Sequence, residues 1–340
     1  MQKIRIAMLG AGGISNHHVR GLLGNPDKIE CVALCDVSDE NMRERSEQLG
    51  GGQLQYRDWK KMFAEIGDQI DAVDICLPHH LHGAAIFDAL KAKKHILCEK
   101  PMCIDLEEAA NIVAGVKDAG VTYMSAHNQL FFPAVQEAKR MLDSGMIGKL
   151  RWVRSQDCHH IRGMFGGTWR SNLKSQGGGV LIDTGYHPTY RLLYFADAKI
   201  EAVRGTYSRF GQNIDGEDTA SVQVRFENGV IGEIFTSWVM SNPHNTHQIH
   251  LVGDKGQIFG SDDILYYLPN GFKEPARFEV SSNGSAFAKS FELQMAHFAE
   301  CIQEKKRPIH GAEEGYSTLE IILKSSRDAE GWQETAPMKL

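Results

Sequence analysis

The sequence predicts an α/β protein built in two parts: an N-terminal doubly wound parallel sheet, and an α+β domain with a large, mostly antiparallel open sheet. Two observations lead to this expectation. In the first third of the 340 residues, short apolar runs alternate with segments of helical periodicity, and the connections between them are brief. After residue 132 the pattern changes to period-two blocks separated by turn sequences. We place the boundary near residue 126 and predict domains at 1–126 and 127–340.

Five runs in the first part are typical of buried parallel strands, because they are short, continuous and rich in Ile, Val and Leu. Helical segments separate them, and right-handed crossovers then produce a sheet with helices on both faces. The strands are expected at Lys3–Leu9, Glu30–Cys35, Asp71–Leu77, Lys94–Cys98 and Val121–Ala126, and the helices at Ile14–Leu23, Asp39–Leu49, Leu81–Lys91 and Leu106–Ala119.

The second part mixes both kinds of element. Turn signals such as Asn228-Gly229 separate alternating blocks between residues 201 and 280, which indicates a meandering sheet. Strands are expected at Leu150–Asp157, Ala220–Phe226 and Val230–Ser237. Helices are expected at Ala134–Ser144, Phe287–Glu304 and Glu313–Asp328, and one further helix is expected to end at Phe195.

Composition limits the classes of function. The 37 basic and 43 acidic residues provide no broad cationic surface, so neither nucleic acid nor a membrane surface is an expected partner. No apolar run approaches the ~18 residues that a membrane-spanning helix needs, and no export signal is visible. The seven cysteines form no CxxC pair, which favours buried free thiols in a reducing cytoplasm.

The first strand runs into a glycine-rich turn containing Gly10, Gly12 and Gly13, and Ile14 opens the next helix. In a dinucleotide site, such glycines allow a tight turn and a close approach of the backbone to the pyrophosphate. The negative charge of the pyrophosphate then lies at the N-terminus of the helix. This arrangement predicts a dinucleotide-binding first domain.

Asp36 ends the second strand and indicates which dinucleotide is bound. A carboxylate at this place accepts hydrogen bonds from the adenosine ribose hydroxyls and repels a 2′-phosphate. Val37 and Ser38, rather than an arginine, follow it, so no cation is expected beside such a phosphate. We therefore expect NAD as the cofactor in preference to NADP.

Two further motifs complete a recognisable pattern. Glu99-Lys100-Pro101 follows the fourth strand, and residues 177–187 read GGGVLIDTGYH at the start of a helix. Together with the glycine turn, these motifs resemble the Gfo/Idh/MocA family, the group of glucose-fructose oxidoreductase and inositol dehydrogenase, over nearly the whole chain. The resemblance implies a Rossmann domain, NAD(P) between the two domains, and a second sheet that often serves as an oligomer interface. We accordingly expect a homo-oligomer formed through the C-terminal sheet.

The resemblance also implies catalytic residues. It places Lys100 near the reacting carbon and the nicotinamide, often beside a cis peptide bond. Oxidising a secondary alcohol by hydride transfer needs a base for the hydroxyl proton and positive charge near the developing alkoxide. We expect Lys100 to supply the charge or relay the proton, and His187 to be the base. Asp183, four residues before His187, is expected on the same helix face.

Two neighbours of His187 qualify this expectation. Pro188 disfavours helical geometry in the residue before it, so His187 is expected in the first turn of the helix. Tyr190 stands where relatives often carry an acid, which leaves the partner that orients His187 open.

Other positions complete the expected site. The family uses the loop of Pro78 and His82 near the nicotinamide ribose. Leu130 stands where many relatives carry an arginine, which argues against a strongly anionic substrate. Trp169 matches a loop that covers the active site, where its ring can stack on a sugar. Two histidine clusters are expected to donate hydrogen bonds to a polyhydroxylated ligand, and no metal is expected. The first cluster is His79, His80 and His82, and the second is His159 and His160. The predicted cofactor residues are Gly10, Gly12, Gly13, Ile14, Asp36, Pro78, His82, Glu99 and Lys100, and the predicted substrate residues are Asn128, His159, His160, Arg162, Trp169 and Arg170.

The leading hypothesis is an NAD-dependent dehydrogenase or reductase for a neutral cyclic polyol, that is, a sugar, a glycoside or an inositol. The wide polar loop before Arg170 suggests oxidation at C3 of a glycoside. One alternative is a glycosidase that retains NAD and acts by oxidation and elimination. Another alternative is a catalytically silent regulator that senses the dinucleotide, although the presence of Lys100, Asp183 and His187 argues against it.

Overall fold

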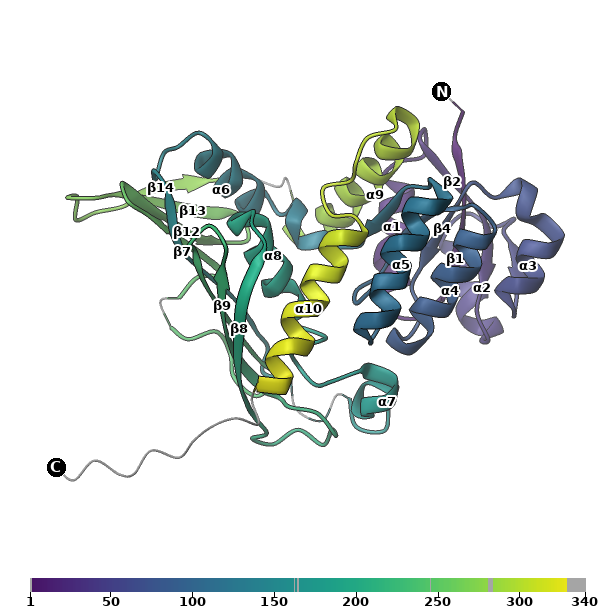
Figure 1. The fold of residues 1–340 in the computed structure, drawn as a ribbon. Coiled ribbons are helices and arrows are strands. Elements are labelled where there is room, and N and C mark those ends of the chain that lie inside the picture. Colours follow the sequence, from purple (N-terminus) through teal and green to yellow (C-terminus); the bar gives the residue numbers. More distant parts are fainter. Residues whose placement is uncertain (1, 162, 164, 245, 281–283, 329–340) are drawn as a thin grey trace.

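The computed structural model describes residues 2–161, 163, 165–244, 246–280 and 284–328. Two sheets, one in each part of the chain, form the framework, and the last two helices lie between them (Figure 1). None of the helices described is long and apolar enough to cross a membrane. The seven cysteines are all buried and unpaired, as the sequence predicted.

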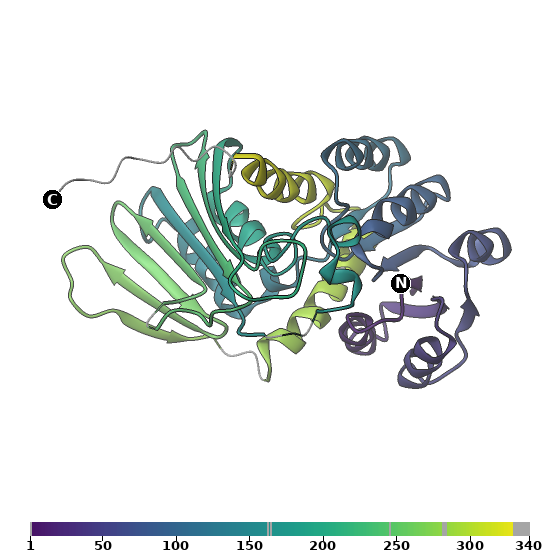
Figure 2. The same ribbon diagram turned by 90° about the horizontal axis from the view of Figure 1, so that it is seen from below.

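The first sheet has six parallel strands in the order β3-β2-β1-β4-β5-β6. Helices lie on both of its faces (Figures 1 and 2). The order reverses between β1 and β4, and a doubly wound sheet binds ligands at the carboxyl ends of the strands at that point. The strands are β1 Ile4–Leu9, β2 Ile29–Cys35, β3 Leu54–Tyr56, β4 Ala72–Ile75, β5 His95–Cys98 and β6 Tyr123–Ser125, and the helices are α1 Ser15–Leu23, α2 Asp39–Gln48, α3 Trp59–Ile66, α4 His79–Lys91 and α5 Leu106–Ala119.

All five predicted strands and four predicted helices of this domain are present within a few residues of the expected bounds. Strand β3 and helix α3 were not predicted from the sequence. The β3 strand has three residues and lies at the sheet edge, where Leu54 and Gln55 are exposed. A strand this short and this exposed leaves no continuous apolar run in the sequence.

The second sheet has eight strands in the order β14-β13-β12-β11-β7-β10-β9-β8, and all neighbours are antiparallel except β7 and β10. Helices α6, α8 and α10 lie on one face of it, and neither view shows a helix on the other face (Figures 1 and 2). Its elements are α6 Pro133–Asp143, β7 Leu150–Cys158, α7 Leu173–Gln176, α8 Tyr186–Ala196, β8 Ile200–Ser208, β9 Thr219–Phe226, β10 Ile231–Ser237, β11 Ile249–Gly253, β12 Gly256–Ser261, β13 Ile264–Pro269, β14 Ala276–Glu279, α9 Ala286–Glu304 and α10 Ala312–Asp328.

The last two helices return to the first domain. Helix α9 packs on α1, where a Cβ atom on Gly21 would lie 2.7 Å from the carbonyl oxygen of Phe291. Helix α10 packs on α5, α8 and β8. The C-terminal helices therefore hold the two sheets together, and the division at residue 126 stays a prediction.

A buried histidine pair lies where the connection between α9 and α10 meets the end of β6. The Nδ1 atoms of His127 and His310 are 2.8 Å apart, so one ring donates and the other accepts. Burial lowers the pKa of His310 to about 3 and lowers the pKa of His127 well below its usual value. Both imidazoles are therefore neutral at physiological pH, as a donor–acceptor pair requires.

We expect acid to destabilise the protein through these rings. The unfolded chain takes up a proton at His310 near pH 6.5, whereas the folded chain takes it up only near pH 3. The contribution of His310 is complete above pH 6.5 and is lost as the pH falls through this window, by about 1.4 kcal/mol per pH unit for one proton. Urea unfolding at pH 7 and pH 5 measures this loss. His310→Gln should reduce the pH dependence, and the same change at the exposed His244 should leave it as in the wild type; equal pH dependence in all three proteins would contradict the account.

Candidate active site

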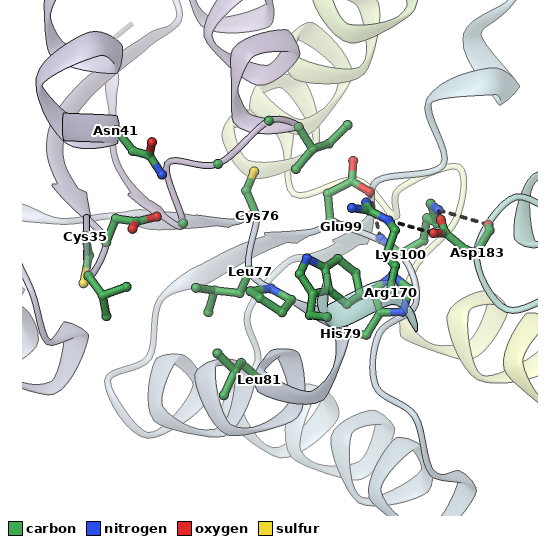
Figure 3. Close-up of a pocket in the computed structure, with 18 of the residues that line it drawn as sticks. Cys35, Asn41, Cys76, Leu77, His79, Leu81, Glu99, Lys100, Arg170 and Asp183 are labelled. Carbon is green, nitrogen blue, oxygen red and sulfur yellow. Dashed lines mark hydrogen bonds and ion pairs between the residues drawn. The ribbon is translucent and has the colours of Figure 1, made fainter. Parts of the chain in front are cut away.

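A cavity of about 650 Å³ opens where β1, β2, β4 and β5 end, and loops and turns of the second part of the chain line it as well. The glycine turn and Asp36 lie at one end. Lys100, Asp183 and Arg170 lie at the other end, joined by hydrogen bonds and ion pairs (Figure 3). The cavity therefore brings most of the predicted cofactor residues together with two of the three predicted catalytic residues. His187, the third, is not among the residues that line it.

The glycine turn has the backbone that a dinucleotide needs. Gly10 has a φ of +95°, and a Cβ atom there would lie 2.5 Å from the carbonyl oxygen of Cys76. Nothing lies within 4 Å of the Cβ positions of Gly12 and Gly13, which line the cavity. Helix α1 begins at Ser15, and no side chain caps its first turn. The uncapped N-terminus of this helix and the open glycine backbone fit a pyrophosphate.

Asp36 lines the same end of the cavity. One carboxylate oxygen accepts a hydrogen bond from the Ala11 N–H at 2.6 Å, and the other accepts from the Ser38 N–H at 2.8 Å. These bonds fix the carboxylate beside the glycine turn while leaving it further acceptor capacity for ribose hydroxyls.

A buried ion pair forms the catalytic end of the cavity. Lys100 Nζ donates to Asp183 Oδ1 at 2.7 Å and to the Asp183 carbonyl oxygen at 3.0 Å, and Arg170 Nε donates to Oδ2 at 2.9 Å. Burial by itself would raise the pKa of Asp183, but the charges of Lys100 and Arg170 hold it well below its usual value. The Lys100-Pro101 peptide is cis, as the resemblance implied. Asp183 thus aims the ammonium of Lys100 at the edge of the cavity.

His187 lies in the first turn of α8, as predicted from Pro188, and is half-buried. Its Nδ1 atom lies 2.7 Å from the hydroxyl oxygen of Tyr190, which answers the open question about its orienting partner. Burial lowers the pKa of His187 to about 3, with a further lowering by the charge of Lys100. The expectation that Asp183 shares a helix face with His187 is wrong, because α8 begins only at Tyr186 and Asp183 lies in the turn before it.

Comparison with known proteins decides the family. The model described as "Oxidoreductase family, NAD-binding Rossmann fold" matches residues 4–127, and the one described as "GFO/IDH/MocA C-terminal domain" matches residues 135–259. This chain belongs to the Gfo/Idh/MocA family. It is an oxidoreductase whose first domain is an NAD-binding Rossmann domain, and NAD is its cofactor.

Individual relatives match most of the chain. It is 26% identical to the scyllo-inositol 2-dehydrogenase (NAD(+)) of Bacillus subtilis (strain 168) over 314 residues, which cover 90% of this chain and 88% of the relative. It is 27% identical over 270 residues to the myo-inositol 2-dehydrogenase of Thermotoga maritima, covering 76% and 75%. A solved complex of levoglucosan dehydrogenase with NADH and levoglucosan superposes with a TM-score of 0.89 at 21% identity, covering 97% of this chain and 98% of that chain. The structural likeness shows a shared fold.

Two elements that were not predicted from the sequence, β3 and α3, are followed or begun by residues that line the dinucleotide cavity. Arg57 and Trp59, which follow β3, line the Asp36 end of the cavity. The Arg57 guanidinium donates to the Val37 carbonyl at 2.7 Å and to Asp39 at 3.1 Å. The expectation of no cation near Asp36 is therefore wrong. The cation is Arg57, which directly follows the neighbouring strand β3 and is distant in sequence from Asp36.

A second charged group lies beneath the catalytic end and was not predicted. His18, on α1, donates from Nδ1 to Asp74 at 2.9 Å and from Nε2 to Glu99 at 3.0 Å. Burial alone would lower the pKa of His18, but Asp74 raises it well above its usual value. Glu99 also accepts the Lys100 N–H at 3.1 Å. His18, Asp74 and Cys76 come within 4.8 Å of one another, but an imidazolium that donates from both nitrogens has no lone pair for a metal.

Predicted residues of the two loops over the cavity lie in different places. Pro78 and Trp169 line it, and the Arg170 guanidinium lies 4.3 Å from the centre of the Trp169 ring. His79 lines it as well, but its Nδ1 faces the Gln176 carbonyl oxygen at 2.9 Å. His82 is buried, and both of its ring nitrogens face backbone carbonyls, of Pro101 and Leu77, at 2.6 Å. The first histidine cluster therefore supports the loops around the cavity.

Of the other predicted substrate residues, Asn128, His159 and His160 lie outside the cavity lining. Asn128 is buried and donates to Ser290 on α9 at 3.0 Å. His159 pairs with Asp157 at 3.0 Å with its side chain 55% exposed, and His160 is exposed. Arg162 lies outside the described residues. Substrate binding by these four residues stays a prediction.

The His18 group leads to a prediction about stability. Replacing His18 by leucine leaves Asp74 and Glu99 buried without their cation, which typically costs about 3–5 kcal/mol. Chemical denaturation at pH 7 measures the difference. Lys28→Met is the control, because Lys28 and Glu300 form a pair with both side chains more than a third exposed, and such pairs contribute about 1 kcal/mol or less. Equal losses in the two variants would contradict the assignment of His18 as a buried cation.

Proposed function

We propose that this protein is an NAD-dependent dehydrogenase or reductase that acts on a secondary alcohol of a neutral cyclic polyol: a sugar, a glycoside or an inositol. The observation that carries the proposal is the Lys100–Asp183 pair at the inner end of the dinucleotide cavity. The inositol dehydrogenases among the relatives and the levoglucosan complex support the same substrate class.

The residues of the site have separate roles in this reaction. NAD bound in the cavity accepts or supplies the hydride. Lys100 holds positive charge against the substrate oxygen, and the proton of that oxygen passes to or from Lys100 or His187. Asp183 holds Lys100 and Arg170 in place. Because both cations are paired with this carboxylate, the site does not require an anionic substrate. The ring of Trp169 offers a surface for the C–H face of a sugar.

The loop between His159 and Arg170 supports the narrower proposal of oxidation at C3 of a glycoside. Phe165, Trp169 and Arg170 of this loop line the cavity, and a bulky aglycone would lie against them. A glycosidase that retains NAD would instead cleave the glycoside without releasing NADH. A silent regulator would bind NAD and exchange no hydride. The free buried thiols support a reducing compartment such as the cytoplasm.

We also propose that the protein forms a homo-oligomer through the uncovered face of the second sheet. Half-exposed side chains from neighbouring strands form a continuous apolar surface there, with ring centres of Trp152, His250, Phe259 and Tyr266 successively 5.3, 5.2 and 5.3 Å apart. Ile231, which is 50% exposed, is paired with Trp152 in the sheet. A surface of this kind is typical of a protein–protein interface.

Substitution of either proton-exchanging residue tests the catalytic proposal. Lys100→Ala and His187→Ala should each lower turnover by ~10² or more, the scale of general acid–base loss, and should leave NAD binding largely intact. The assay is NADH absorbance with inositols, free hexoses and aryl glycosides, together with NAD titration by protein fluorescence. Lys91→Ala, an exposed change at the end of α4, is the matched control. Near-normal turnover in both catalytic variants would reject the roles, and no hydride exchange by the wild type across the panel would reject the function.

Light scattering after size-exclusion chromatography tests the interface. Ile231→Asp places a charge in the proposed contact and should yield smaller species than the wild type. Leu173→Asp alters a similarly exposed apolar residue on α7, away from the sheet, and should leave the mass unchanged. A monomeric wild type, or an oligomer unaffected by Ile231→Asp, would contradict the proposal.

A further inference from the structure

The hydroxyl group of Tyr190 lies between two partners, the backbone of Gln129 and the ring of His187. It accepts a hydrogen bond from the backbone N–H of Gln129 at 3.1 Å and lies 2.7 Å from Nδ1 of His187. Tyr190 itself is fully buried. Water therefore cannot replace either partner.

The donors and acceptors available determine which atom donates in the hydrogen bond between Tyr190 and His187. A backbone N–H can only donate, so the Tyr190 oxygen is the acceptor toward Gln129. The single hydroxyl hydrogen then needs an acceptor, and among the residues that the structure describes His187 Nδ1 is the one in reach. The opposite arrangement, with a hydrogen on Nδ1, would leave the buried hydroxyl hydrogen unpaired at a cost of about 1–3 kcal/mol.

The surroundings prevent the two partners from rearranging. The side chain of Gln129 accepts from Arg191 at 2.6 Å and donates to Asp157 at 3.2 Å, which fixes the orientation of the Gln129 backbone. The Tyr190 ring stacks on His127, with ring centres 4.2 Å apart and planes 10° apart. The donor, the phenol and the imidazole are therefore held in one arrangement.

We propose that Tyr190 is a positioning residue that keeps His187 in the neutral tautomer with its proton on Nε2, so that His187 meets the substrate oxygen as a hydrogen-bond donor. This inference rests on the proposed function and revises the expectation that His187 is the base. A carboxylate at position 190 would accept a hydrogen from Nδ1 and leave Nε2 free to accept a proton. The phenol imposes the reverse pattern, and Nε2 is the ring nitrogen left for a ligand.

The proton of the reaction then belongs to Lys100. In the reducing direction, the carbonyl carbon receives the hydride, the Lys100 ammonium gives its proton to the developing alkoxide, and His187 stabilises the same oxygen through its Nε2–H. Lys100 is left as the neutral amine and regains a proton from solvent, and oxidation is the reverse. A neutral imidazole is an effective partner for a carbonyl oxygen in this role.

The groups facing His187 favour its neutral form as well. Burial and the nearby cations Lys100 and Arg191 lower its pKa, and they outweigh the opposing anions Asp157 and Glu99. Glu99 and Lys100 follow β5, Asp157 lies on β7, and Arg191 lies on α8. The imidazole is therefore expected to keep the same protonation pattern across the neutral range.

Nitrogen-15 NMR of the full chain with labelled histidine tests the proposal without any substrate. The His187 signals are identified by comparison with His187→Gln. We expect an unprotonated, pyridine-type nitrogen at Nδ1 and a protonated, pyrrole-type nitrogen at Nε2, unchanged between pH 6 and pH 8. The reverse assignment, with pyridine-type Nε2, would overturn the inference and return His187 to the role of base.

Variants at Tyr190 test the cause of this pattern. Tyr190→Phe should abolish the tautomer preference and average the two nitrogen signals, and Tyr190→Asp should reverse it. Tyr194→Phe removes a hydroxyl one turn further along α8 and should change neither signal. An unchanged His187 pattern in Tyr190→Phe would overturn the role of Tyr190, and if that variant fails to fold, the wild-type spectrum still decides the tautomer. If the wild type shows the expected histidine spectrum but oxidises no polyol, the proposed function is rejected and the assignment of the tautomer stands.

Discussion

The ion pair between Lys100 and Asp183 is the constraint on which the rest of the site depends. The two residues are 83 positions apart and come from different domains, at the end of β5 and in the turn before α8. Their side chains are only 11% and 10% exposed, so each charge is tolerated because the other neutralises it. This contact fixes the direction of the ammonium and links the two parts of the chain at the cavity, in addition to the packing of the C-terminal helices.

The charges around this pair alternate in sign. Asp74, His18 and Glu99 lie on the Rossmann side, and Lys100, Asp183 and Arg170 follow on the side of the second domain. The first group carries one net negative charge and the second one net positive charge. An array of this kind is already oriented before a substrate enters, and preorganised charge is the usual source of electrostatic stabilisation in a transition state.

Sequence patterns predicted those parts of the molecule that depend on local chemistry. Buried parallel strands, the glycine turn and Asp36 leave signals in composition and spacing, and Lys100 was found from its motif. The parts that depend on tertiary contact were not predictable. Arg57 directly follows a three-residue edge strand with no apolar run, and His18 occupies a helix position whose partners lie on β4 and directly after β5. The hydrogen-bond direction at Tyr190 depends on the backbone of Gln129, 61 residues away.

Transfer of deuterium tests the central claim most directly. The protein is incubated with NAD and cyclic polyols that carry deuterium on their carbinol carbons, and the nicotinamide product is analysed by mass spectrometry and NMR. The account predicts that one deuterium appears at C4 of the nicotinamide, on a single face, with a matching ketone from the polyol. Conversion of the polyol with NADH that contains no deuterium would contradict direct hydride transfer at this site.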